Sequence, residues 1–135
     1  MLLSVRDLRV SYGKIEAVHG VSFDVDEGEI VTLIGANGAG KSTILNTIAG
    51  LQNADSGEIV YQGTDISPLG AHGVVKQGLA LVPEGRRIFG NLTVYENLRL
   101  AGFQLDSGKL DQRIQRVYEY FPRLEERRGQ LGDTL

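Results

Sequence analysis

The feature that most constrains the fold is a glycine-rich loop at residues 35–42, which reads GANGAGKS and fits the pattern Gly-x-x-x-x-Gly-Lys-Ser. Before it, residues 29–34 form an apolar run typical of a buried strand. After it, residues 44–51 place apolar side chains at the spacing of a helix, with Gly50 as a stop. A strand, a glycine loop and a helix in this order predict an anion site at the start of the helix.

Each residue type in the loop has a chemical reason. Gly35, Gly38 and Gly40 permit backbone angles and close approaches that let successive N–H groups point at phosphate oxygens. Lys41 supplies a positive charge for β- and γ-phosphates, and the Ser42 hydroxyl is placed to bind Mg²⁺. The loop therefore predicts nucleotide-phosphate binding; the pattern alone leaves open a glycine-rich turn that arose by chance.

The remaining segments alternate between strand and helix patterns. Strands are predicted at residues 2–12, 21–25, 29–34, 57–63 and 79–83, with a turn at residues 26–28. A weak helix is predicted at about residues 69–77. A second helix is predicted to begin at about Thr93, because Thr93 and Glu96 have capping-box spacing. A third is predicted at residues 109–120 and should end before Pro122. This order predicts an α/β fold.

Composition excludes several classes of function. With 135 residues and 41% hydrophobic residues the chain can bury a core. A net charge of −3 provides no broad basic field, so we expect no nucleic acid partner. There is no cysteine, so no disulfide or thiolate metal site is expected. No apolar run approaches the roughly 20 residues that cross a bilayer, so we expect no direct membrane insertion.

A phosphate loop does not name the base or the reaction. The Asp-x-x-Gly and Asn-Lys-x-Asp motifs of GTPases do not occur, whereas a small-molecule kinase stays open on the loop alone. Three stretches add a resemblance: VSYGKIEAVHGVSFDVDEGEIVTLIGANGAGKSTILNTIAGL, ADSGEIVYQGTDI and GLALVPEGRRIFGNLTVYENL. Together they resemble the nucleotide-binding subunits of ABC transporters, most closely an ATPase subunit of the high-affinity branched-chain amino acid importer.

The resemblance implies an architecture and a function. The expected fold is an α/β P-loop NTPase core with an N-terminal antiparallel β portion and the start of an ABC-type helical subdomain. We expect an ATP-binding core at residues 1–84 and the start of the helical subdomain at residues 85–135. The implied function is ATP binding and hydrolysis that drive import of branched-chain amino acids.

The resemblance also assigns site residues. Tyr12 is expected to stack on adenine with Val18 near the same base, although periodicity alone favours Tyr12 as a core aromatic at a strand end. Glu84 stands where most ABC proteins have glutamine; we expect it to bind Mg²⁺ in a catalytic role beside Lys41, with a solvated loop carboxylate as the alternative. The phosphate loop of the family matches Asn37, Gly38, Ala39, Gly40, Lys41, Ser42 and Thr43.

Cofactors, partners and location follow from the same resemblance. ATP and Mg²⁺ are the expected cofactors, with Ser42 and Glu84 as the metal-binding residues. The expected partners are membrane permease subunits and a second ATP-binding subunit, in a homodimer or a heterodimer. The protein is then cytoplasmic and peripheral on the inner face of the cell membrane. Arg86 and Arg87 contact the permease in one interpretation and are simply solvated in the other.

Two motifs expected for hydrolysis do not occur: the apolar strand ending in Asp-Glu, called Walker B, and the signature Leu-Ser-Gly-Gly-Gln. The family signature would begin near Leu135, so we expect the N-terminal part of a longer subunit that binds ATP without turning it over. Two alternatives remain: an ABC-type ATPase with no membrane partner, and a non-catalytic ATP-binding or assembly module.

Overall fold

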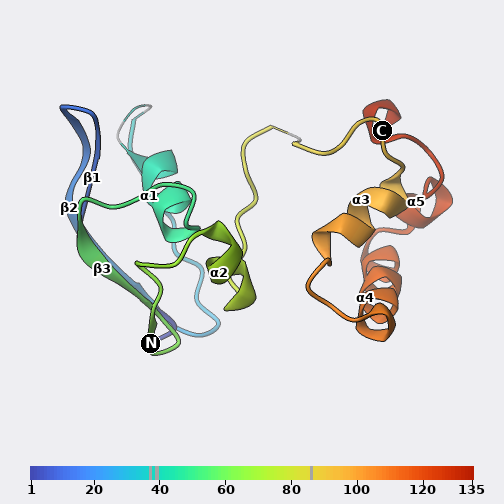
Figure 1. The fold of residues 1–135 in the computed structure, drawn as a ribbon, viewed down its shortest axis with the longest axis horizontal. Helices are drawn as coiled ribbons and strands as arrows, with labels where there is room; N and C mark the ends of the chain where they lie inside the picture. The colour runs from blue at the N-terminus through green and yellow to red at the C-terminus, as the bar shows by residue number, and fades with distance from the viewer. Residues whose placement is uncertain (37, 39, 86) are drawn as a thin grey trace. The chain divides into compact units, whose positions relative to one another are not determined.

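The structure is a computed structural model that describes residues 1–36, 38, 40–85 and 87–135. It divides into two compact units, Met1–Val82 and Pro83–Leu135, each of which is described by itself. The elements of the first unit are β1 (Leu3–Tyr12), β2 (Ile15–Val25), α1 (Lys41–Ile48), β3 (Ser56–Tyr61), β4 (Thr64–Asp65) and α2 (Ala71–Lys76) (Figure 1). Those of the second are α3 (Val94–Ala101), α4 (Ser107–Tyr120), α5 (Pro122–Glu126) and the 3₁₀ turn η1 (Gly132–Thr134).

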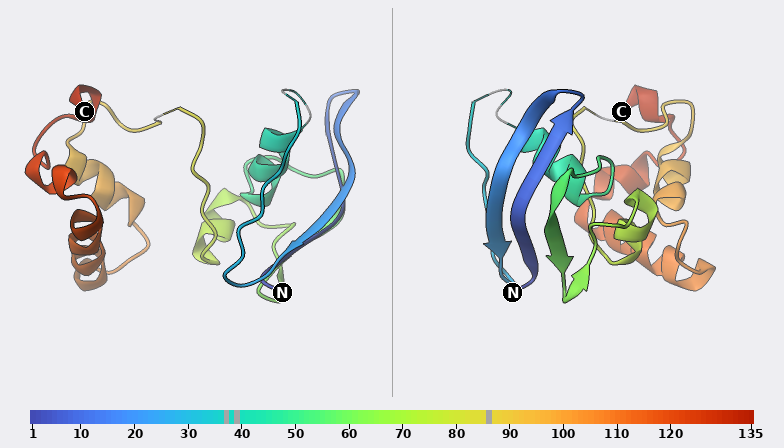
Figure 2. Two further views of the ribbon diagram at one scale, coloured as in Figure 1. Left: turned by 180° about the vertical axis from the view of Figure 1, so that it is seen from behind. Right: turned by 60° about the vertical axis from the view of Figure 1, so that its left-hand side comes forward.

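The first unit is built on an antiparallel sheet with strand order β2-β1-β3-β4 (Figure 2). The register pairs of β1 are interrupted between Val5 and Leu8, where Asp7 has a φ of 45°. This irregularity shifts the alternation of side chains, so that Val5, Leu8 and Val10 are all fully buried although their spacing is not strictly two. The central strand therefore supplies the main apolar row of the core.

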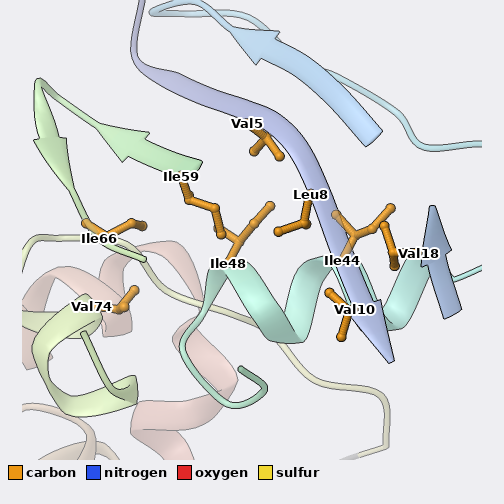
Figure 3. Close-up of a cluster of buried hydrophobic side chains, with 9 residues drawn as sticks. All are labelled: Val5, Leu8, Val10, Val18, Ile44, Ile48, Ile59, Ile66 and Val74. Carbon is orange, nitrogen blue, oxygen red and sulfur yellow. The ribbon is translucent and has the colours of Figure 1, made fainter. Parts of the chain in front are cut away.

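Helix α1 covers this row. Its apolar residues Ile44 and Ile48 lie one turn apart and point toward the buried side chains of the sheet (Figure 3). Val74 of α2 is 1% exposed and belongs to the same cluster. Burial of apolar side chains on both sides of this interface holds the start of α1 in a defined position against β1 and β2.

Two predicted strands are wrong. Residues 29–34 and 79–83 form neither strand nor helix, and Ile30, Ile34 and Val82 are 94%, 93% and 92% exposed. A strand exists only where a neighbour pairs with its N–H and C=O groups, and the described residues provide no such neighbour for either segment. Their apolar character is typical of strands covered on both faces, an environment that this unit does not supply.

The other predicted elements of the first unit are confirmed. The strand patterns at residues 2–12, 21–25 and 57–63 lie on β1, the end of β2 and β3, and the weak helix at residues 69–77 contains α2. The turn at residues 26–28 is closed by the Glu29 N–H, which donates to the Asp26 carbonyl at 3.2 Å. Helix α1 ends as predicted, since Gly50 has a φ of 81°.

The second unit is a small helical cluster. The capping box predicted for Thr93 and Glu96 is confirmed, because the Glu96 N–H donates to the Thr93 hydroxyl at 3.1 Å and the Thr93 N–H to the Glu96 carboxylate at 3.0 Å. Helix α4 is capped by Asp106 and ends before Pro122, which begins the unpredicted helix α5. The buried residues of this unit's core cluster are Leu110, Ile114 and Tyr118.

Candidate nucleotide-binding site

The glycine loop leads into the N-terminus of α1. Gly38 and Gly40 have φ values of 83° and 93°, in the left-handed region that favours glycine. A Cβ atom on Gly40 would lie 2.6 Å from the Ala17 carbonyl oxygen of β2, so the backbone there is too close for any side chain. The predicted residues Asn37 and Ala39 lie outside the described residues. Gly40 therefore fixes the start of α1 directly against the sheet.

Lys41 is the first residue of α1. Its ammonium group donates to the Gly35 carbonyl at 2.5 Å, so the side chain folds back across the loop. The first turn of α1 contains no acidic residue, which leaves the positive end of the helix dipole uncompensated by a side chain. A cation and a helix N-terminus thus converge on one short loop, the arrangement that binds a phosphate.

Thr43 and Tyr12 come together beside the loop. Thr43 is buried, and its hydroxyl lies 3.2 Å from the Tyr12 hydroxyl. The Thr43 carbonyl accepts a hydrogen bond from the Thr47 hydroxyl at 2.7 Å, which secures the first turn of the helix. Tyr12 ends β1 and is 49% exposed, so one part of its ring is anchored while the rest is open to solvent. An aromatic face beside a phosphate loop is suited to a nucleotide base.

The other predicted residues have different settings. Ser42 is exposed at the start of α1, whereas Val18 is only 2% exposed and belongs to the core. Val18 Cγ2 lies 3.3 Å from the position of a Cβ on Gly40, so this side chain supports the loop from the core. Glu84 is exposed and belongs to the second unit, which is described by itself.

A residue missed by the sequence analysis organises the loop before α3. The Asn97 carboxamide accepts from the Phe89 N–H at 2.9 Å and donates to the carbonyls of Phe89 and Thr93, both at 3.0 Å. Asparagine is unfavourable inside helices because its side chain competes for backbone groups. Asn97 lies one turn after Thr93, directly behind the capping box, and this position was the sequence signal for a side chain that bonds the loop backbone.

No helix among the described residues is long and apolar enough to cross a membrane. The same residues hold no cluster of three or more histidine, cysteine or carboxylate side chains able to bind a metal ion.

Residues 18–133 match the sequence profile of the ABC transporter family. The chain belongs to this family. It is 48% identical over 134 residues to the high-affinity branched-chain amino acid transport ATP-binding protein BraG of Pseudomonas aeruginosa, a match that covers 99% of this chain and 58% of BraG. A probable branched-chain amino acid transport ATP-binding protein, LivF of Archaeoglobus fulgidus, is 36% identical over 135 residues, which cover 100% of this chain and 57% of LivF.

A solved structure gives the same result. The ATP-binding subunit of an ABC transporter superposes with a TM-score of 0.81 at 34% sequence identity, over 97% of this chain and 54% of that chain. The predicted ABC-type fold and the family resemblance are therefore confirmed. This ABC transporter-family chain spans less than 60% of the length of either curated relative.

Proposed function

We propose that this chain provides the ATP-binding part of an importer that couples ATP hydrolysis to uptake of branched-chain amino acids. The observation that carries the proposal is the loop at the start of α1, where Lys41 and a helix N-terminus face one anion site. The 48% identity to BraG supports the choice of transported solute. Membership of the ABC transporter family supports ATP hydrolysis as the reaction.

The phosphates bind to backbone N–H groups between Gly38 and Thr43. The Lys41 ammonium now bonds a neutral carbonyl, and it gains a stronger, charge-assisted bond when a β- or γ-phosphate oxygen replaces that carbonyl. The bond to Gly35 thus holds the lysine over the loop until nucleotide arrives.

The adenine stacks on Tyr12. Support for this role comes from the half-exposed ring and from the 3.2 Å contact between its hydroxyl and that of Thr43, which holds the ring next to the first turn of α1. Stacking on one face is tolerant of base identity, so Tyr12 contributes affinity more than selectivity.

The Mg²⁺ ion would be held by Ser42 and Glu84. A hydroxyl and a carboxylate are the hard oxygen donors that Mg²⁺ prefers, and the phosphates complete the set. When bound, the ion neutralises charge that develops on the phosphates during hydrolysis. Glu84 has a second proposed role, as a catalytic residue that acts with Lys41 at the γ-phosphate.

The partners in this proposal are membrane permease subunits and a second ATP-binding subunit. The permease contact uses the loop from Glu84 to Asn91, where Arg87 and Phe89 are exposed and Asn97 holds the backbone. With such partners the protein is cytoplasmic and peripheral on the inner face of the membrane. The importer interpretation follows BraG, which is named a transport ATP-binding protein.

The test is a calorimetric titration of Mg·ATP into the chain and into Lys41→Ala. Loss of the charged donor should lower the affinity for ATP about tenfold to a hundredfold or more, because charge-assisted bonds contribute about 1.5–3 kcal/mol. The circular dichroism spectrum should stay unchanged, since Lys41 is not part of the apolar core.

The matched control is Lys109→Ala, which removes one exposed lysine from α4 in the second unit. Its ATP affinity should equal that of the parent. Equal affinity of Lys41→Ala and the parent would show that the nucleotide does not bind at this loop.

A further inference from the structure

The second unit contains an open cavity of about 580 Å³ that the proposed function does not use. One wall is a face of α4, where Asp111, Ile114, Gln115 and Tyr118 recur at helical spacing. Tyr95 and Arg128 also line the cavity, and a backbone bond ties them together, since the Tyr95 N–H donates to the Arg128 carbonyl at 3.0 Å. The volume lies within the usual range for small-molecule sites, and backbone bonds hold its walls in place.

A buried hydroxyl lies at this cavity without a partner. Tyr118 is 4% exposed, and its hydroxyl is buried with no hydrogen bond within the described part of the chain. Buried polar groups are normally bonded, so such a group calls for a ligand or an ordered water. Burial also raises the pKa of Tyr118, and the hydroxyl therefore remains a donor at neutral pH.

Opposite charges stand on two walls of the cavity. The Arg128 side chain is 64% exposed, and its ion pair with Glu125 is long at 4.0 Å. Asp111 is 66% exposed and lies 3.5 Å from Arg99. Both pairs are loose and solvated, so each charged group can take a further partner.

We propose that this cavity binds a free α-amino acid in its zwitterionic form. Arg128 bonds the carboxylate, Asp111 bonds the ammonium group, and the apolar side chain packs on Ile114. A zwitterion offers a carboxylate to Arg128 and an ammonium group to Asp111, whereas a simple anion or a simple amine can bond one of the two.

Tyr118 donates its hydroxyl to the carboxylate. Tyr118 lines the cavity together with Gln115 and Arg128, whose long side chains are exposed. The choice of a branched-chain guest rests on the proposed function, since an importer delivers this product to the side where its ATP-binding subunit lies. Occupancy of the cavity then reports the level of imported product.

The experiment titrates L-isoleucine into the chain with ¹³C-labelled tyrosine rings, in the presence of Mg·ATP. A dissociation constant on the order of 1 mM is expected for so small a ligand, with the Tyr118 signals shifting. Arg128→Gln and Asp111→Asn should each weaken binding about tenfold or more, and Tyr118→Phe about threefold to tenfold. Arg113→Gln, an exposed arginine of α4 that does not line the cavity, is the control and should bind like the parent.

Two analogues test the zwitterion. Isoleucinamide lacks the carboxylate and 3-methylvalerate lacks the ammonium group, so each should bind at least about tenfold more weakly. The proposal is overturned by absence of binding at about 20 mM isoleucine, by equal affinity for 3-methylvalerate, or by indifference to Arg128→Gln and Tyr118→Phe. It is also overturned if the assembled transporter excludes isoleucine from the cavity, because a protein segment then occupies it.

Failure here is separable from failure of the proposed ATP site. Lys41→Ala should lose ATP and keep isoleucine, whereas Arg128→Gln should show the reverse. Loss of ATP binding is therefore read from one variant and loss of amino acid binding from the other.

Discussion

The close approach of Gly40 to β2 makes Gly40→Ala the most informative single change in the loop. An alanine at a φ of 93° pays about 1–2 kcal/mol for its backbone angle. Its Cβ would also lie 2.6 Å from the Ala17 carbonyl, and relief of that overlap must move backbone, which adds about 1–3 kcal/mol. The reduced entropy of the unfolded chain offsets about 0.4–1 kcal/mol. The net loss of unfolding free energy should be about 1–4.5 kcal/mol, with a central value near 3 kcal/mol.

Gly38→Ala is the matched control. Gly38 has a similar φ of 83°, but a Cβ there would meet nothing within 4 Å among the described residues. The loss of unfolding free energy in Gly38→Ala should therefore come from the backbone angle alone, about 0–1.5 kcal/mol after the unfolded-state offset. The two variants separate the cost of the overlap from the cost of the angle.

The assay is urea unfolding followed by far-ultraviolet circular dichroism, with the midpoints compared at a common slope. Gly40→Ala should also weaken ATP binding, because the start of α1 moves away from β2. If the two alanine variants lose the same stability within about 0.5 kcal/mol, the close approach of the loop to Ala17 does not constrain this site.

Three further predictions concern ATP and the permease. In calorimetry, Tyr12→Ala should weaken ATP binding by about 1–3 kcal/mol and leave the binding of inorganic triphosphate nearly unchanged. Tyr12→Phe keeps the ring, so its ATP affinity should stay within about threefold of the parent. Equal losses of affinity for both ligands in Tyr12→Ala would show that Tyr12 has only a structural role. Photocrosslinkers at Arg87 and Phe89 should label the permease in the intact transporter, and labelling confined to probes on other faces would contradict the proposed surface. The 135-residue chain should bind Mg·ATP and release no phosphate above the level of Lys41→Ala, because the Walker B strand and the Leu-Ser-Gly-Gly-Gln signature expected for hydrolysis do not occur in it. Lysine-dependent release at the rate of a full-length relative would refute this.

Features whose physics is local could be predicted from the sequence. The Thr93 capping box, the stop at Gly50 and the end of α4 before Pro122 depend on a few neighbouring residues, and the structure contains all three. Strand β1 was also predictable, although the irregularity at Asp7 that brings Val5 and Leu8 to one face was not.

Other features depended on what lies next to a segment in space. Residues 29–34 and 79–83 have the composition of buried strands, yet a strand needs pairing neighbours, and its own residues do not specify them. The half-exposed ring of Tyr12, the core position of Val18 and the Tyr118 hydroxyl, which has no partner among the described residues, likewise follow from contacts between distant residues. The sequence by itself determined the glycine turn before α1 and the helix caps, because their geometry depends on consecutive residues. Only the tertiary structure decided which side chains are buried, exposed or left without a partner, because burial depends on the elements that pack around each side chain.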